Sequence, residues 1–263
     1  MVYIKEYWTE KEKRAEIARK HAKKMDELHN KKIQESIRGT IVYSPGFVYG
    51  KKVDSSEIKI SLKNSDSVNA IFSSDTYNDK RMAVLNFASY KNPGGMFING
   101  SKAQEECLCH ESFLYNVLKE FPEYYEWNNS HKNKALYTNR ALYSYNIMFE
   151  HDQKQRYCDV ITCAAPNFSA ATKYQKVSRQ ENNRILISRI QFVLDIAMDN
   201  NVGTLILGAY GCGVFGQNPR EVALIFKNLL ESGHYNFNEV IFAIPKDGTN
   251  YEEFERVFNE RIN

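Results

Sequence analysis

The feature that most constrains this fold is a series of short apolar runs separated by stretches with helical character. Each run is long enough for one buried strand and too short for a buried helix. Buried strands that alternate with helices are typical of an α/β sheet. The runs that we expect to form these strands are 58–60, 82–87, 159–164, 204–207 and 240–244. The sequence therefore predicts an α/β protein.

Residues 9–37 contain neither Gly nor Pro, and small or apolar residues recur there at every third or fourth position. This spacing predicts one long amphipathic helix that is ended by Gly39 and followed by a short strand over 40–43. Its basic residues are interleaved with acidic ones, which is typical of a solvated helix face. We expect it to be an accessory element packed on the core. Further helices are expected at 103–118, 181–200, 219–230 and 251–263, and the polar segment 128–134 is expected to be a surface loop.

Length and composition fit one globular domain with an appended helix. A chain of 263 residues is long enough to bury a sizeable core. The formal charge of +3 is too small to imply a nucleic-acid-binding protein by itself. The sequence shows no signal peptide and no apolar run of membrane-spanning length, and its five cysteines are an odd number, so we expect a reduced, cytoplasmic protein without a membrane partner. Cys107 and Cys109 would point to different faces of a helix, which favours structural thiols over metal ligands.

Two glycine-rich segments follow apolar runs at widely separated places in the chain. The first reads Asn92-Pro-Gly-Gly-Met-Phe-Ile-Asn-Gly100, and the second reads Gly208-Ala-Tyr-Gly-Cys-Gly-Val-Phe-Gly216. Backbone amides in such segments can cradle phosphate oxygens, and ligands of open α/β sheets bind at the carboxyl ends of strands. The glycine spacing excludes a standard dinucleotide-binding fingerprint, and neither segment continues as a Walker A loop. We therefore predict that a diphosphate is held between the two segments.

Glu105 and Glu106 are adjacent carboxylates that follow the first glycine segment and Gln104. Acidic residues are common in the first turn of a helix, where they interact favourably with the helix dipole. Neighbouring residues on a helix project about 100° apart, so the pair is not expected to act as the opposed carboxylates of an ordinary glycosidase. One carboxylate is instead expected to hold a hydroxyl group while the other transfers a proton.

Taken together in this order and spacing, the motifs resemble those of the microbial-type poly(ADP-ribose) glycohydrolases, which have the macrodomain fold. The resemblance covers nearly the whole chain. It rests on 84–89, 92–95, 104–106 with Ser112, Leu114 and Tyr115, 164–167, and 208–215 with Asn218 and Pro219. The resemblance implies a macrodomain-like α/β/α sandwich with a mixed central sheet. Residues 1–56 would form an N-terminal helical extension, and 57–263 would form the ADP-ribose-binding catalytic domain.

The implied activity is cleavage of ribose-ribose O-glycosidic bonds in poly(ADP-ribose), which releases ADP-ribose without a metal or redox cofactor. The implied partners are ADP-ribose or poly(ADP-ribose) on modified proteins, with ADP-ribosylated nucleic acid as a further candidate. By position, Glu106 resembles the catalytic acid, and Glu105 resembles the neighbour that holds ribose hydroxyls. Asp66 and Ser67 sit where the fold often contacts adenine. The substrate-binding residues implied by the match are Asn92, Gly94, Gly95, Gln104, Gly211, Cys212, Gly213, Val214 and Phe215, of which Phe215 would orient the distal ribose.

Met96 departs from the family pattern, whose loop has a third glycine at this position. A side chain here could alter affinity or substrate preference, and two other functions therefore stay open. The protein could bind ADP-ribose without cleaving it, in which case binding would occur without turnover. It could also hydrolyse mono-ADP-ribose attached to protein or nucleic acid, which would use the same cleft and the same acid.

Overall fold

The computed structural model describes residues 2–51, 57–76 and 80–259, with residues 2–8 described by their backbone alone. The predicted division between an extension and a catalytic domain falls at residues 52–56, outside the described ranges, and it stays a prediction. Within those ranges, no helix has both the length and the apolar content that crossing a membrane would require.

A seven-stranded mixed sheet forms the centre of the molecule, as the sequence predicted. Its strand order is β1-β4-β5-β3-β6-β7-β2. The five strands β5, β3, β6, β7 and β2 are parallel to one another, whereas β4 is antiparallel to both of its neighbours, β1 and β5. The strands are β1 (Ile41–Tyr43), β2 (Lys59–Lys63), β3 (Arg81–Phe87), β4 (Ala141–His151), β5 (Lys154–Cys163), β6 (Val202–Leu207) and β7 (Glu239–Ala243).

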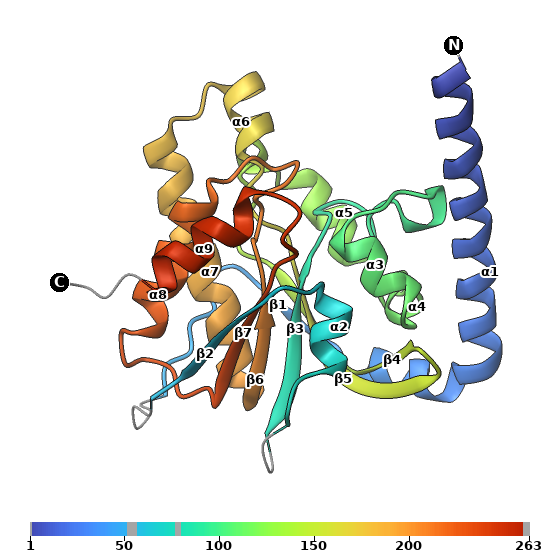
Figure 1. Cartoon of the computed structure of the whole chain (residues 1–263), viewed down its shortest axis with the longest axis horizontal. Helices are drawn as coiled ribbons and strands as arrows, with labels where there is room; N and C mark the ends of the chain where they lie inside the picture. The colour runs from blue at the N-terminus through green and yellow to red at the C-terminus, as the bar shows by residue number, and fades with distance from the viewer. Residues whose placement is uncertain (1, 52–56, 77–79, 260–263) are drawn as a thin grey trace.

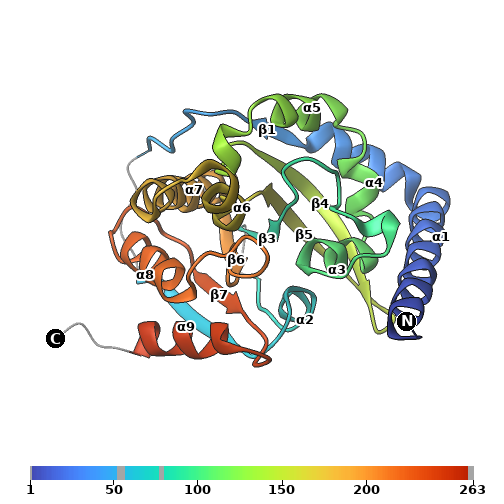
Figure 2. The ribbon, with the colours of Figure 1, turned by 90° about the horizontal axis from the view of Figure 1, so that it is seen from above.

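Helices cover both faces of the sheet, which gives the expected α/β/α sandwich (Figures 1 and 2). One apolar core lies between the sheet and the group α7, α8 and α9, and the other lies under α1 to α5. The helices are α1 (Val2–Gly39), α2 (Ser67–Phe72), α3 (Gln104–His110), α4 (Leu114–Leu118), α5 (Pro122–Ser130), α6 (Phe168–Gln175), α7 (Arg179–Asp199), α8 (Pro219–Leu230) and α9 (Thr249–Asn259), with short 3-10 turns η1 (Phe97–Asn99) and η2 (Asn133–Ala135).

The long first helix is confirmed, and it packs along the edge of the molecule with a kink at His29. Ala18, Ala22 and Met25 are buried because their spacing places them on one side of the helix. A Cβ on Gly100 would lie 2.0 Å from the carbonyl oxygen of Lys11, so the end of the first glycine segment touches the helix backbone. The side chain of Arg14 donates to the Gly100 carbonyl at 2.9 Å, and Arg19 donates to the Ile98 carbonyl at 3.1 Å. The helix therefore supports the first glycine segment directly.

Two expectations for local structure were wrong, and one strand was not predicted. The predicted helix 103–118 is two helices, because Ser112 pairs with Phe149 of β4 and interrupts the helical hydrogen bonds. Strand β4 was not predicted, since a bulge between Ser144 and Ile147 breaks its alternating pattern. The segment 128–134 is not merely a surface loop, because Asn128 is buried at the end of α5 and donates to the Tyr90 carbonyl at 2.9 Å. Residues 260–263 of the last predicted helix lie outside the described ranges.

Candidate active site

The two glycine segments lie at the same edge of the sheet. The first glycine loop (residues 92–100) follows the end of β3, and the second glycine loop (residues 208–216) follows the end of β6. Because β3 and β6 are parallel neighbours, their carboxyl ends meet at one edge. The rings of Phe87 and Tyr210 lie 5.7 Å apart, and a Cβ on Gly208 would lie 2.9 Å from the Phe87 ring. The starts of the two loops are therefore in contact.

Gly94 and Gly95 have the left-handed backbone conformation, with φ of +63° at each. A Cβ on Gly95 would lie 2.6 Å from Glu106 Oε1 and 2.9 Å from Glu105 Oε2. A Cβ on Gly94 would meet the ring of Tyr115 at 2.9 Å and the thiol of Cys109 at 3.2 Å. Both the backbone conformation and the close packing therefore require glycine here. The two predicted carboxylates converge on the first loop.

Glu105 is buried at the start of α3, and both of its carboxylate oxygens accept hydrogen bonds. The side-chain amide of Asn86 donates to Oε1 at 3.1 Å, and the backbone amide of Ser89 donates to Oε2 at 2.6 Å. Burial raises the pKa of Glu105 to about 8, with the Glu106 charge adding to the rise and the two hydrogen bonds opposing it. The site therefore retains a proton at neutral pH.

Glu106 is also buried, but its carboxylate is held at only one oxygen. The backbone amide of Met96 donates to Oε1 at 2.9 Å. Oε2 has no hydrogen bond to any residue in the described part of the chain. The pair is thus asymmetric, since Glu105 is fully engaged and Glu106 keeps one oxygen for another partner.

Met96 faces this carboxylate with its backbone, while its side chain has room on the side of α1. The thioether lies 3.9 Å from the amide nitrogen of Asn99, and both residues line a cavity of about 470 Å³ against α1. The side chain is 41% exposed. The departure from the family's third glycine therefore leaves the hydrogen bond to Glu106 in place.

Gln104 joins the helix to the sheet. Its side-chain oxygen accepts from the Phe87 amide at 2.8 Å, and its nitrogen donates to the Leu85 carbonyl at 2.9 Å and to Ser67 Oγ at 3.0 Å. In this structure it fixes α3 on the end of β3. Asp66 caps α2 by accepting from the Asn69 amide at 2.8 Å, so both predicted adenine contacts lie at the start of that helix.

The second glycine loop is tight at its base and open at its tip. Gly211 has a φ of +76°, and a Cβ there would lie 2.8 Å from both Ala165 and Gln217. Cys212 is half-buried, and burial raises the pKa of its thiol to about 12. By contrast, a Cβ on Gly213 would meet nothing within 4 Å, and the Val214 side chain is 89% exposed. The tip can therefore move or adapt without disturbing the core.

Phe215 closes the second loop against a group of aromatic side chains. Its ring packs edge-on to Tyr137 at 6.1 Å, and Tyr137 stacks on Tyr90 at 4.1 Å. Its carbonyl accepts from the Ser169 amide of α6 at 3.0 Å. Asn92, which the resemblance implies to bind the reacting ribose, is exposed at the start of the first loop. Asn218 caps α8 and accepts from the Glu221 amide at 3.1 Å, so a helix N-terminus follows the second loop.

Sequence reasoning gave no role in holding the carboxylates to Asn86, Ser89 or Met96, although 84–89 is among the matched segments. Asn86 lies in β3 and also donates to Thr162 Oγ1 of β5 at 3.3 Å, which ties Glu105 to two strands. An asparagine inside an otherwise apolar strand was a usable signal, because a buried polar side chain needs partners. The amides of Ser89 and Met96 carry no comparable signal, since any residue supplies a backbone amide.

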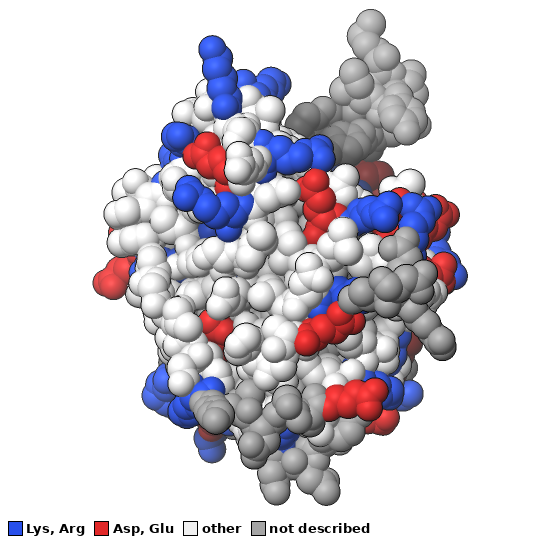
Figure 3. Space-filling view, turned by 90° about the vertical axis from the view of Figure 1, so that its left-hand side faces the viewer, with Lys and Arg blue, Asp and Glu red and all other residues white. Residues whose placement is uncertain are grey.

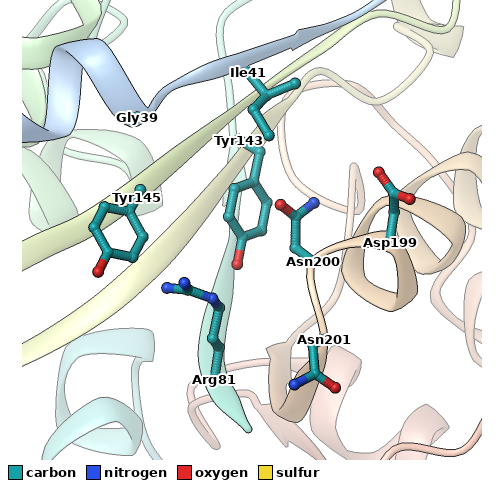
Figure 4. A pocket seen from close by; sticks show the side chains of 8 residues that line it. All are labelled: Gly39, Ile41, Arg81, Tyr143, Tyr145, Asp199, Asn200 and Asn201. Carbon is teal, nitrogen blue, oxygen red and sulfur yellow. The ribbon is translucent and has the colours of Figure 1, made fainter.

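A second cavity of about 470 Å³ lies at the other edge of the sheet, where Arg81 reaches between Tyr143 and Tyr145 (Figure 4). Arg81 begins β3, and the strand rises about 3.3 Å per residue, so this cavity is about 20 Å from the end of β3. The guanidinium group of Arg81 forms an ion pair with Asp159 at 3.3 Å. We therefore do not place the site there. Within the described ranges, no three His, Cys, Asp or Glu side chains are grouped as metal ligands.

Comparison with known proteins places this geometry in a family. A model of the microbial-type PARG catalytic domain (PARG, poly(ADP-ribose) glycohydrolase) matches residues 6–152, which include the first loop and both carboxylates. The crystal structure of poly(ADP-ribose) glycohydrolase from Thermomonospora curvata is 27% identical with a TM-score of 0.82, and the match covers 94% of this chain and 100% of that one.

The same enzyme bound to the inhibitor ADP-HPD is 26% identical with a TM-score of 0.80, and the match covers 93% of this chain and 99% of that one. The enzyme from Deinococcus radiodurans in complex with ADP-ribose is 28% identical with a TM-score of 0.77, and the match covers 86% of this chain and 97% of that one. No curated protein matches the chain.

Proposed function

The chain belongs to the microbial-type poly(ADP-ribose) glycohydrolase family, and from this premise we propose which residues hydrolyse the polymer. The reaction of the family is hydrolysis of poly(ADP-ribose). We assign the acid to Glu106 and the positioning of ribose hydroxyls to Glu105. The bond broken is the ribose-ribose O-glycosidic bond, and the product is ADP-ribose.

The asymmetry of the carboxylate pair supports this assignment most strongly. Departure of a ribose oxygen from an oxocarbenium-like centre requires that oxygen to be protonated. A residue that delivers a proton needs an oxygen that can face the substrate, and Glu106 Oε2 meets this need while both Glu105 oxygens are engaged. Burial raises the pKa of Glu105 to about 8, which favours its neutral form and lowers the negative charge beside Glu106. Water then completes the hydrolysis at the anomeric carbon.

The two glycine loops would position the substrate, whereas the carboxylates would transfer the proton. The diphosphate would lie between the backbone of Gly94 and Gly95 on one side and that of Gly211, Cys212, Gly213 and Val214 on the other. Phe215 would orient the distal ribose, and Asn92 would bind the reacting ribose beside Glu106. Accurate placement of the reacting bond lowers the activation barrier by several kcal/mol in well-oriented reactions. We extend the partner class to proteins and nucleic acids that carry ADP-ribose.

The function is tested by release of free ADP-ribose from poly(ADP-ribose), measured beside release from mono-ADP-ribosylated protein. We expect release from the polymer. Release from the mono-modified protein alone would contradict the proposal and identify a mono-ADP-ribosyl hydrolase. Binding of ADP-ribose with release from neither substrate would identify a binding module.

A further inference from the structure

Helix α6 connects the second glycine loop to a separate part of the surface. Its first turn touches the loop, because the Ser169 amide donates to the Phe215 carbonyl and a Cβ on Gly216 would lie 2.1 Å from Ser169 Oγ. Tyr174 lies five residues further along the helix, which corresponds to a rise of about 7.5 Å. A step of five residues also turns about 140° around the helix axis, so Tyr174 lies on a different side of α6 from Ser169, whereas Lys173, four residues on, lies near the side that touches the loop. The end of α6 is therefore one to two helical turns from the second glycine loop.

This surface combines an exposed aromatic ring with two lysines, and we name Lys173, Tyr174 and Lys176 the α6 patch. Tyr174 is 68% exposed, and Lys173 Nζ lies 5.1 Å from the centre of its ring. Neither lysine forms an ion pair with any residue that the structure describes. Figure 3 shows the side of the molecule that lies at the left in Figure 1. Lys and Arg side chains gather at its upper end, where Figure 1 places α6.

Three lysines of α1 differ, because each forms an ion pair with a glutamate on the same helix. Lys13 pairs with Glu10 at 2.8 Å, and Lys20 pairs with Glu16 at 2.6 Å. Such pairs cancel the local charge that would attract a polyanion. A single exposed tyrosine is ordinary in soluble proteins. A tyrosine between two lysines without ion pairs to the described residues, at the end of a helix that touches the second glycine loop, is a more specific arrangement.

We propose that the α6 patch binds the ADP-ribose unit on the leaving side of the scissile bond, so that the enzyme recognises two consecutive units of the polymer. The inference rests on the proposed function. That unit carries an adenine, which can stack on an aromatic ring, and a diphosphate, which attracts ammonium groups. Free ADP-ribose has no such unit, and its binding does not involve the patch.

The test uses Lys173→Gln/Lys176→Gln and Tyr174→Ala, each in a Glu106→Gln protein that binds polymer without cleaving it. Binding of poly(ADP-ribose) is measured by fluorescence anisotropy, and binding of free ADP-ribose by calorimetry. We expect the double lysine variant and Tyr174→Ala each to weaken polymer binding by about tenfold, as loss of phosphate contacts or of one stacked base does. The affinity for free ADP-ribose should stay within about twofold.

Salt dependence identifies the contribution of the two lysines. Removing both should lower the slope of log affinity against log salt by about 1.4, at about 0.7 for each phosphate contact with a single strand. The matched control is Lys24→Gln/Lys31→Gln, which removes two exposed lysines from α1 with the same change in net charge. The control should bind polymer as the parent does.

Three results would overturn the inference: an equal loss in the control, an equal loss of free ADP-ribose binding, or unchanged polymer binding in the patch variants. Release of ADP-ribose by the unsubstituted protein is measured in parallel. Failure of that release would contradict the proposed function, whereas the binding comparison judges the patch independently.

Discussion

The two glycine loops lie at one edge of the same sheet, yet they differ in how tightly they are built. In the first loop, Gly95 fills the space between two buried carboxylates, and a single added carbon would come within 3 Å of both. In the second loop, Gly213 has open space around it and Val214 is almost fully exposed. The difference supports our proposal that the first loop shapes the reacting centre and that the second loop holds the diphosphate with a tip that can adjust.

The largest expected effect comes from Glu106→Gln. Gln keeps the size of the side chain but cannot deliver the proton, so kcat for ADP-ribose release should fall by about 10³-fold, within the range of general acid catalysis. The affinity for ADP-ribose should stay within about tenfold, because the lost interaction acts in the transition state. Kinetics and calorimetry on the same preparation measure both quantities. Equal losses of rate and affinity would contradict the assignment.

The next effect compares one glycine from each loop. Gly95→Ala places a Cβ against both carboxylates at a φ of +63°, so we expect kcat/KM to fall by about 100-fold and the protein to lose about 1–3 kcal/mol of stability. A Cβ on Gly213 meets no protein atom within 4 Å, so Gly213→Ala should change stability little and should lower kcat/KM much less than Gly95→Ala does. Similar effects of the two substitutions on activity would remove the distinction between the loops.

A smaller effect is expected for Phe215→Ala, which removes the ring that packs on Tyr137. Loss of orientation of the distal ribose should lower kcat by about tenfold. The neighbouring Val214→Ala is the matched control, since the Val214 side chain is exposed and should not affect the rate. An unchanged kcat in Phe215→Ala would remove this side chain from the site.

The smallest effect is a change in how the unfolding free energy depends on pH. It compares Glu105, which packs against the first loop, with Cys212 of the second loop. The pKa of Glu105 is about 8 in the folded protein, above its ordinary value of 4.5, so the folded state binds this proton more tightly than the unfolded chain. The contribution of Glu105 protonation to the stability of the folded state is complete below about pH 4.5 and is lost as the pH rises towards 8. Glu105→Gln should therefore flatten the dependence of the unfolding free energy on pH between these values.

Denaturant unfolding at several pH values measures this slope. The control lies in the second loop, where Cys212→Ala should leave the slope unchanged because the pKa of that thiol is about 12. A slope that is the same in Glu105→Gln and in the parent would show that Glu105 does not titrate in this range.

The sequence predicted the parts of this molecule that depend on local pattern. The apolar runs became β2, β3, β5, β6 and β7, and the long helix and both glycine loops were placed correctly. These features follow from short-range periodicity and from turn chemistry. Strand β4 was missed because a bulge hides its alternation, and the break after α3 depends on a bridge between Ser112 and Phe149. Pairings between distant residues leave little trace in local sequence.

The residues of the candidate site could be located from the sequence to a similar extent, and their roles stay predictions. The carboxylate pair and the glycines could be located from their spacing, and the family resemblance gave them roles. The asymmetry between Glu105 and Glu106 could not be predicted, because it depends on which oxygen meets Asn86, Ser89 or Met96 after folding. The same holds for Met96, whose side chain is accommodated against α1, a helix far away in the sequence.

The most direct test of the account is a comparison of Glu105→Gln and Glu106→Gln in single-turnover release of ADP-ribose from saturating poly(ADP-ribose). We expect Glu106→Gln to slow release by about 10³-fold while it still binds ADP-ribose. Glu105→Gln should retain measurable release, with weaker binding of ADP-ribose. The reverse result, in which Glu105→Gln abolishes release and Glu106→Gln retains it, would contradict the assignment of the acid and the division of roles within the carboxylate pair.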